Sequence, residues 1–162
     1  MAITKEKKIE IVKDLEKAIK GVKSIVFVNF HKLPVKETTM LRRSLREQGV
    51  SYKVAKKTLI KRALGTVKAE GELPELDGEV AIVYGQDELA PAREVYSFQK
   101  VHKDSIAILG GVFEGKYLNK EAMLSIAMIP PLQTLRGMFV NLINSPIQRV
   151  VIALDQIAKK QG

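Results

Sequence analysis

Hydrophobic and polar positions follow two different periods along the first part of the chain. Apolar side chains recur every three or four residues over 4–20 and over 35–48, which predicts two amphipathic helices, each followed by a glycine. Residues 24–30 are rich in β-branched and aromatic side chains on both faces, as in a central strand of a sheet. Apolar and polar residues alternate over 50–54, which predicts a second strand, and residues 56–64 predict a short basic helix.

The same alternation of elements resumes after an acidic, weakly patterned segment. Residues 66–78 contain Pro and Gly and few regularly spaced apolar positions, which indicates a surface loop. Strands are predicted over 80–84 and 105–109, with a helix over 87–103 between them and a short helix over 119–128 after them. Helices and strands in this order predict an α/β fold, an α+β sandwich in which a sheet of about four strands carries packed helices.

A proline pair at 130–131 separates this globular domain, residues 1–130, from a C-terminal amphipathic helical segment, residues 131–162. The segment contains two amphipathic stretches. Ser145-Pro146 lies between them and predicts a new helix start, because Ser favours the N-cap and Pro the first helical turn. The second stretch places six apolar side chains on one face: Ile147, Val150, Val151, Leu154, Ile157 and Ala158. Such a stripe packs either on the protein's own core or on an amphipathic partner, and both alternatives stay open here.

Composition places the chain among folded soluble proteins. Its 162 residues are 46% hydrophobic and 28% charged, which is typical of one globular domain and too apolar for a disordered chain. The absence of cysteine excludes disulfide bonds, a thiolate nucleophile and thiolate-bound zinc. No uninterrupted apolar run reaches the ~18 residues of a membrane span, and the first residues are too charged for a signal peptide. We therefore expect a cytoplasmic protein that binds no membrane.

The positive charge is concentrated in the first part of the chain. The net charge is +9, but residues 1–65 carry 13 Lys and 4 Arg against 6 acids, a net of +11. Residues 66–162 carry 7 Lys and 3 Arg against 12 acids, a net of −2. This asymmetry indicates that one part of the molecule contacts a polyanion.

One dense basic cluster follows His31 in the predicted elements. Glu37 and Glu47 are the only acids within its span, so a phosphate-binding surface is favoured over an ordinary solvated face. The cluster consists of Lys32, Lys36, Arg42, Arg43, Arg46, Lys53, Lys56, Lys57, Lys61 and Arg62. Phe27 and Phe30 are expected in the core, which leaves no aromatic platform for stacked bases. Duplex or folded RNA recognised by its shape is therefore the predicted ligand.

Catalytic chemistry finds little support. Residues 110–116 match the spacing G-x-x-x-x-G-K of a phosphate-binding loop, but Tyr117 stands where a Ser or Thr would bind Mg²⁺. A turn between the fourth strand and the next helix is the favoured interpretation of that segment. His31 and His102 lack metal-ligand spacing, and no G-x-S-x-G nucleophile motif occurs. We expect no enzyme activity, metal, cofactor or small-molecule substrate, with a nucleotide-using enzyme built on the 110–116 loop as the competing hypothesis.

Several segments resemble one known family in order and spacing. The chain resembles large-subunit ribosomal protein ten of bacteria, the stalk-base family, over its whole length. The resemblance rests on residues 30–37 (FHKLPVKE), 41–49 (LRRSLREQG), 52–64 (YKVAKKTLIKRAL), 76–81 (LDGEVA), 108–111 (ILGG) and 153–160 (ALDQIAKK).

The resemblance implies a structural constituent of the large ribosomal subunit, bound to the ribosome in the cytoplasm. It implies that the first domain binds large-subunit rRNA at the GTPase-associated region, beside ribosomal protein eleven. The basic cluster and Thr58 are then the rRNA-binding residues. The C-terminal stripe from Ile147 to Ala158 is then the surface that carries dimers of the acidic stalk protein, which recruit translation factors. A ribosome-assembly factor of the same fold is a second alternative, which an interrupted stripe would favour.

Two departures from the family pattern affect these implications. Lys57 stands where the family usually has Asn. This chain therefore lacks the side-chain amide at that position, and a lysine there can contact only a phosphate instead. The helix predicted after Pro146 has about fifteen residues, or ~22 Å at helical rise. That length favours one or two stalk dimers over three.

Overall fold

A computed structural model describes residues 5–65, 70–102 and 105–161. The chain divides into two compact units, Met1–Ile129 and Pro130–Gly162. The division falls within one residue of the proline pair at which the sequence predicted a boundary.

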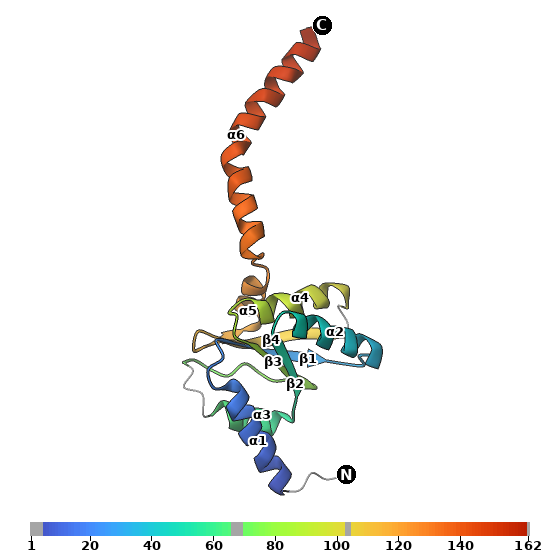
Figure 1. Ribbon diagram of the computed structural model, residues 1–162, viewed down its shortest axis with the longest axis vertical. Helices are drawn as coiled ribbons and strands as arrows, with labels where there is room; N and C mark the ends of the chain where they lie inside the picture. Colours follow the sequence, from blue (N-terminus) through green and yellow to red (C-terminus); the bar gives the residue numbers. More distant parts are fainter. Residues whose placement is uncertain (1–4, 66–69, 103–104, 162) are drawn as a thin grey trace. The chain divides into compact units, whose positions relative to one another are not determined.

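The first unit is built on a single antiparallel sheet of five strands (Figure 1). The strands are β1 (Ser24–Phe30), β2 (Val50–Val54), β3 (Val80–Gly85), β4 (Ile106–Phe113) and β5 (Lys116–Asn119). Their order is β2-β3-β1-β4-β5, so β1 is central, as its apolar character on both faces predicted. The fifth strand was not predicted, because β5 is short and half of its residues are polar.

Helices cover both faces of the sheet, which confirms the predicted α+β sandwich. On one face lie α1 (Lys5–Ile19) and α3 (Lys57–Leu64), and on the other lie α2 (Val35–Glu47), α4 (Ala90–Val101) and α5 (Lys120–Ala127) (Figure 1). Alternate residues of β1 point to opposite faces of the sheet. Ile25 and Phe27 belong to the core beneath α1 and α3, and Val26 and Val28 belong to the core beneath α2, α4 and α5.

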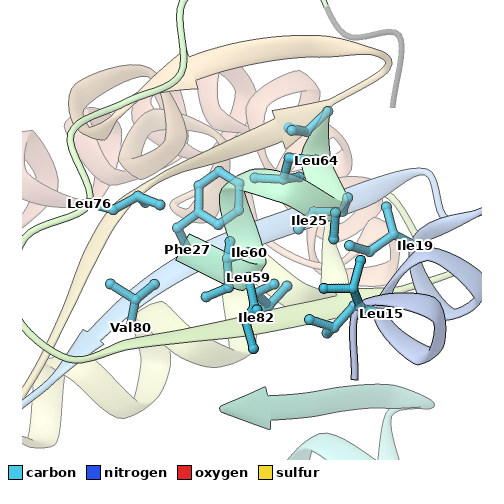
Figure 2. Close-up of a cluster of buried hydrophobic side chains, with 13 residues drawn as sticks. Leu15, Ile19, Ile25, Phe27, Leu59, Ile60, Leu64, Leu76, Val80 and Ile82 are labelled. Atoms are coloured by element: carbon cyan, nitrogen blue, oxygen red, sulfur yellow. The ribbon is translucent and has the colours of Figure 1, made fainter. Parts of the chain in front are cut away.

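The core beneath α1 and α3 fixes the position of the basic elements. Figure 2 shows Phe27 beside Ile60 and Leu76, with Leu15 of α1 completing the cluster. All four side chains are buried, and each contributes about 1.5–3 kcal/mol by leaving water. The short helix α3 is therefore held by its apolar face, which leaves Lys61 exposed and Lys57 half-exposed.

The Gly110-Gly111 pair lies inside β4, so the predicted turn at this point is wrong. A side chain at Gly111 would place a Cβ 2.3 Å from the Ile25 carbonyl oxygen, and one at Gly110 would come within 2.6 Å of the Leu118 carbonyl oxygen. Both glycines permit close strand approach beside a register shift between β1 and β4. The turn follows four residues later, where Glu114 and Gly115 both have positive φ.

The second unit contains one continuous helix, α6 (Leu132–Gln161), so the predicted break at Ser145-Pro146 is wrong. Pro146 lies inside the helix, where it cannot donate a hydrogen bond to the preceding turn. Figure 1 shows that α6 bends about halfway along its length, as a missing hydrogen bond in the middle of a helix explains. The two predicted amphipathic stretches thus belong to the same helix.

Candidate nucleic-acid interface

Three adjoining hollows surround the end of the edge strand β2. Val54, which is 47% exposed, lines all three, and their volumes are about 560, 480 and 500 Å³. The first lies toward α1 and α3, and the other two lie toward α2. Because β2 is at the edge of the sheet, helices from both faces contribute side chains to one surface.

Basic residues line each of these hollows. Lys56 and Lys57 line the first, Arg46 and Lys53 the second, and Lys32 the third, which Arg42 shares with the second. Six residues of the predicted cluster therefore come together, and we call them the basic surface: Lys32, Arg42, Arg46, Lys53, Lys56 and Lys57.

The other predicted residues line none of the three hollows. They lie on α2 and α3, where all are exposed: Lys36, Arg43, Thr58, Lys61 and Arg62. Arg43 forms an ion pair with Glu47, its Nε lying 3.4 Å from the Oε1 atom one turn along α2. The four basic residues among them extend the positive charge beyond the hollows, and Thr58 adds a hydroxyl group on α3.

The charge of the basic surface is not neutralised within the described ranges. None of its six residues forms an ion pair with a described acid, whereas Lys23, Arg43 and Lys159 each do. One acid, Glu79, also lines the first and third hollows, so the six cations outnumber the acidic lining residues and produce a positive potential that attracts a polyanion. The arrangement therefore matches the chemistry of phosphate recognition.

Three aromatic side chains line these hollows: Phe30, Tyr52 and Tyr84. Tyr52 lines the second and third hollows, and the Arg42 guanidinium lies over its ring, 5.4 Å from the centroid. Burial raises the pKa of the Tyr52 phenol, and the nearby Arg42 charge opposes this only in part. The phenol is therefore neutral near pH 7 and can donate a hydrogen bond.

Phe30 differs from the sequence-based expectation. Phe27 is fully buried as predicted, but Phe30 is only half-buried and lines both the first and the third hollow. The sequence contained one indication of this, because Phe30 ends its strand next to the polar His31-Lys32. The surface thus offers apolar contacts as well as the positive charge that the residue pattern suggested.

The glycine-rich segment and His102, which were considered for catalysis, have structural positions in the first unit. Gly110 and Gly111 pack within the sheet, so they do not form a flexible loop that cradles a phosphate. The His102 Nδ1 atom lies 3.3 Å from Glu37 Oε2, linking α4 to α2, and the His102 ring stacks on Phe98. Within residues 5–65, 70–102 and 105–161, no group of three or more His, Asp or Glu side chains is placed to hold a metal.

The helix α6 presents a long apolar surface. Its large apolar side chains are between 40% and 70% exposed, including those of the predicted stripe from Ile147 to Ile157. Leu132, Leu135 and Phe139 of the first half line a further hollow of about 630 Å³.

The length and composition of α6 would also allow it to cross a membrane. However, helical spacing places Asn141, Gln148, Asp155 and Lys159 together on one side, away from Leu154. The Lys159 ammonium pairs with Asp155 at 2.7 Å on that side. A helix with one polar side is typical of a docking helix and differs from a single span that is apolar all round.

Known proteins resemble the chain over both units. Residues 3–100 match the sequence profile of the family described as ribosomal protein L10. The large ribosomal subunit protein uL10 of Fusobacterium nucleatum is 36% identical over 160 residues, which cover 94% of this chain and 94% of the relative. The uL10 proteins of Shouchella clausii and Bacillus licheniformis are 32% and 31% identical over 157 residues, covering 96% of this chain and 94% of each relative.

Proposed function

Because the chain belongs to the ribosomal protein L10 family, we propose that its first unit binds large-subunit rRNA and that α6 carries dimers of the acidic stalk protein. Membership makes it a protein of the large ribosomal subunit, in agreement with the resemblance of its sequence segments. The bound dimers would recruit translation factors. The observation that carries the rRNA assignment is the basic surface, where six cations meet at three hollows, outnumber the one acid, Glu79, that lines them, and form no ion pair with a described acid.

The basic surface suits folded RNA. Its cations come from α2, β2, α3 and the loops that precede the two helices, and they straddle the sheet edge, so they can contact phosphates of more than one strand. Lys36, Arg43, Thr58, Lys61 and Arg62 flank the hollows and are proposed as peripheral rRNA contacts. Lys57 replaces the amide that is usual in the family, and its position on the lining of the first hollow supports a phosphate contact.

The proposed location on the ribosome is the GTPase-associated region, beside ribosomal protein eleven. This placement follows from the family alone, and the protein is accordingly proposed to be ribosome-bound in the cytoplasm. A structural role requires no catalytic centre, so we propose that the chain is not an enzyme.

The exposed stripe of α6 supports the second assignment. Ile147, Val150, Val151, Leu154, Ile157 and Ala158 lie on a helix whose side chains are exposed, and an amphipathic partner helix would cover them. Since α6 is continuous, the stretch before Pro146 adds a second apolar surface to the same helix. Two dimers, one on each half, therefore fit better than one.

Binding to two partners tests the proposal directly. We expect the full-length protein to bind an rRNA fragment from the stalk base more tightly than an unrelated hairpin of equal length, by fluorescence anisotropy. We also expect it to capture purified acidic stalk protein in the same buffer. Equal affinity for the two RNAs would contradict the rRNA assignment, and tight ATP or GTP binding in a parallel titration would favour the enzyme hypothesis.

A further inference from the structure

The first hollow has a lining unlike that of the other two. It is largely apolar, has a volume of about 560 Å³, and is open to solvent between α1, α3 and the sheet edge. Its apolar lining consists of Ile11, Phe30, Val54, Ala55, Leu59 and Val80. We call it the Phe30 hollow.

The rim of the Phe30 hollow is basic. Lys56 and Lys57 belong to its lining, and neither forms an ion pair with a described acid. Lys7 and Lys8 precede Ile11 by one turn of α1, and both are exposed. An occupant with an apolar part and negatively charged groups around it therefore matches this hollow.

A single acid, Glu79, also lines the Phe30 hollow. The Phe30 N–H donates to the Glu79 carbonyl oxygen at 3.0 Å, which places the two residues side by side beyond the last β1–β3 pair. Gly78 before it has φ +70°, and a Cβ there would lie 2.7 Å from Asn29 Nδ2. The backbone that presents Glu79 is thus fixed by the sheet and by a glycine turn.

We propose that the Phe30 hollow accepts one unpaired nucleobase of RNA and prefers guanine. The proposal rests on the proposed rRNA binding and adds a sequence-specific contact to it. A base extruded from a helix offers a flat apolar face to Phe30 and Val54, while its flanking phosphates meet Lys56 and Lys57.

Glu79 gives the preference for guanine. A carboxylate only accepts hydrogen bonds, and guanine presents two adjacent donors, N1–H and the N2 amino group. Adenine and cytosine each present one amino group, and uracil presents a single N–H between two carbonyl oxygens. The expected order of affinity is therefore guanine first, adenine and cytosine next, and uracil last.

An apolar side chain of a neighbouring protein is the competing occupant. It would use the apolar lining, but it would leave the lysines at the rim without anionic partners. An RNA base brings its own phosphates, so the charge around the hollow favours RNA.

The test uses short RNA hairpins that carry one unpaired nucleotide. Hairpins with a G, A, C or U bulge and a fully paired control of the same stem are titrated with the full-length protein at one salt concentration. We expect the G bulge to bind about tenfold more tightly than the paired control, the effect of one stacked base. A U bulge should bind nearly as weakly as the paired control.

Two variants test whether the unpaired base binds in the Phe30 hollow. Ala55→Leu adds volume inside the hollow and should reduce binding of the G bulge to that of the paired hairpin. Glu79→Gln removes a negative charge, so it should strengthen binding of every hairpin slightly while lowering the ratio of G-bulge to U-bulge affinity. Glu121→Gln, on α5 and outside the three hollows, removes the same negative charge and is the matched control, which should leave the ratio unchanged.

The outcomes separate the two proposals. Failure of every hairpin and of the rRNA fragment to bind would contradict rRNA binding itself. Equal affinity for bulged and paired hairpins, with binding retained, would overturn the base site alone and favour a protein side chain as occupant. A hairpin with 2-aminopurine as the unpaired nucleotide tests the base site without a protein variant, because the fluorescence of this base changes when it stacks. Unchanged fluorescence when the protein binds would likewise overturn the base site.

Discussion

The lysines of the basic surface differ from the other lysines of the chain in what surrounds them. Lys53, Lys56 and Lys57 line hollows and have no described acid within ion-pair distance, whereas Lys23 pairs with Glu88 at 2.9 Å. Because these three lysines form no ion pair with a described acid, replacing them breaks no such pair and should cost the fold little. Their contribution is expected in binding.

Replacing Lys53, Lys56 and Lys57 together with Gln should weaken rRNA binding and reduce its dependence on salt. If each lysine contacts a phosphate, the slope of log affinity against log salt should fall in magnitude by about 2 to 3. Affinity measured at several salt concentrations gives the slope.

A control triple variant at Lys36, Lys61 and Arg62 changes the charge equally but touches none of the three hollows. We expect a smaller change in slope for this control. The same loss in both variants would mean that net charge, and not the basic surface, governs binding.

At the scale of elements, β4 shows how packing overrides a sequence motif. The G-x-x-x-x-G-K spacing suggested a loop, but Gly111 lies where β1 approaches too closely for any side chain. Neighbouring residues such as Ile108 and Val112 are buried, which is why the strand continues through both glycines. This approach of two strands is a tertiary feature that no local pattern contains.

Gly111→Ala should therefore destabilise the first unit. The new Cβ would meet the Ile25 carbonyl, which belongs to the central strand and cannot move away, and overpacking of this kind costs about 1–3 kcal/mol. Denaturant unfolding measures the loss. Gly65→Ala is the control, because Gly65 ends α3 with right-handed backbone angles and a Cβ there meets only ordinary contacts; unchanged stability of Gly111→Ala would contradict the close approach.

The helix α6 offers a second test at this scale. Leu154→Asp should abolish or strongly weaken capture of acidic stalk protein, because a carboxylate would replace a side chain whose burial is worth ~1.5–3 kcal/mol. Calorimetric titration with purified stalk protein measures the effect. Since Leu154 is 62% exposed, the melting temperature of the variant should stay unchanged.

Gln148→Asp introduces the same charge on the polar side of α6 and serves as the control. It should bind stalk protein as the unmodified chain does. Loss of thermal stability in Leu154→Asp would instead indicate that the helix packs on the protein's own core, and equal binding by both variants would rule out the stripe.

At the scale of the whole molecule, each of the two units has one of the proposed functions, rRNA binding or stalk-protein binding. The basic surface and the sheet both belong to residues 1–129, while the longest apolar surface belongs to α6. A chain truncated after Pro130 should therefore keep its rRNA affinity and lose all capture of stalk protein. A substantial fall in rRNA affinity of the folded fragment, checked by circular dichroism, would show that α6 also contacts RNA.

Sequence patterns predicted the parts of this molecule that depend on local periodicity. The central strand β1, the helices and the boundary near Pro130 could be inferred from apolar spacing and proline. The edge strand β5 and the continuity of α6 through Pro146 could not, because pairing with β4 and tolerance of one missing hydrogen bond depend on context. The basic cluster was recognisable as a run of charge, but its six convergent residues were not, since their meeting depends on the place of β2 at the edge of the sheet.

The position of β2 at the edge of the sheet also affects the protein when no partner is bound. The opposite edge, β5, is capped by a bridge between Glu70 and Lys116, but β2 has no such cover within the described residues. An open edge strand invites a second copy to add its own strand, and a lysine on that edge discourages it. Lys53 stands on β2, so one of the charges proposed to bind RNA also opposes the pairing of this open edge with a second copy of the chain, and replacing Lys53 with an apolar residue should promote aggregation.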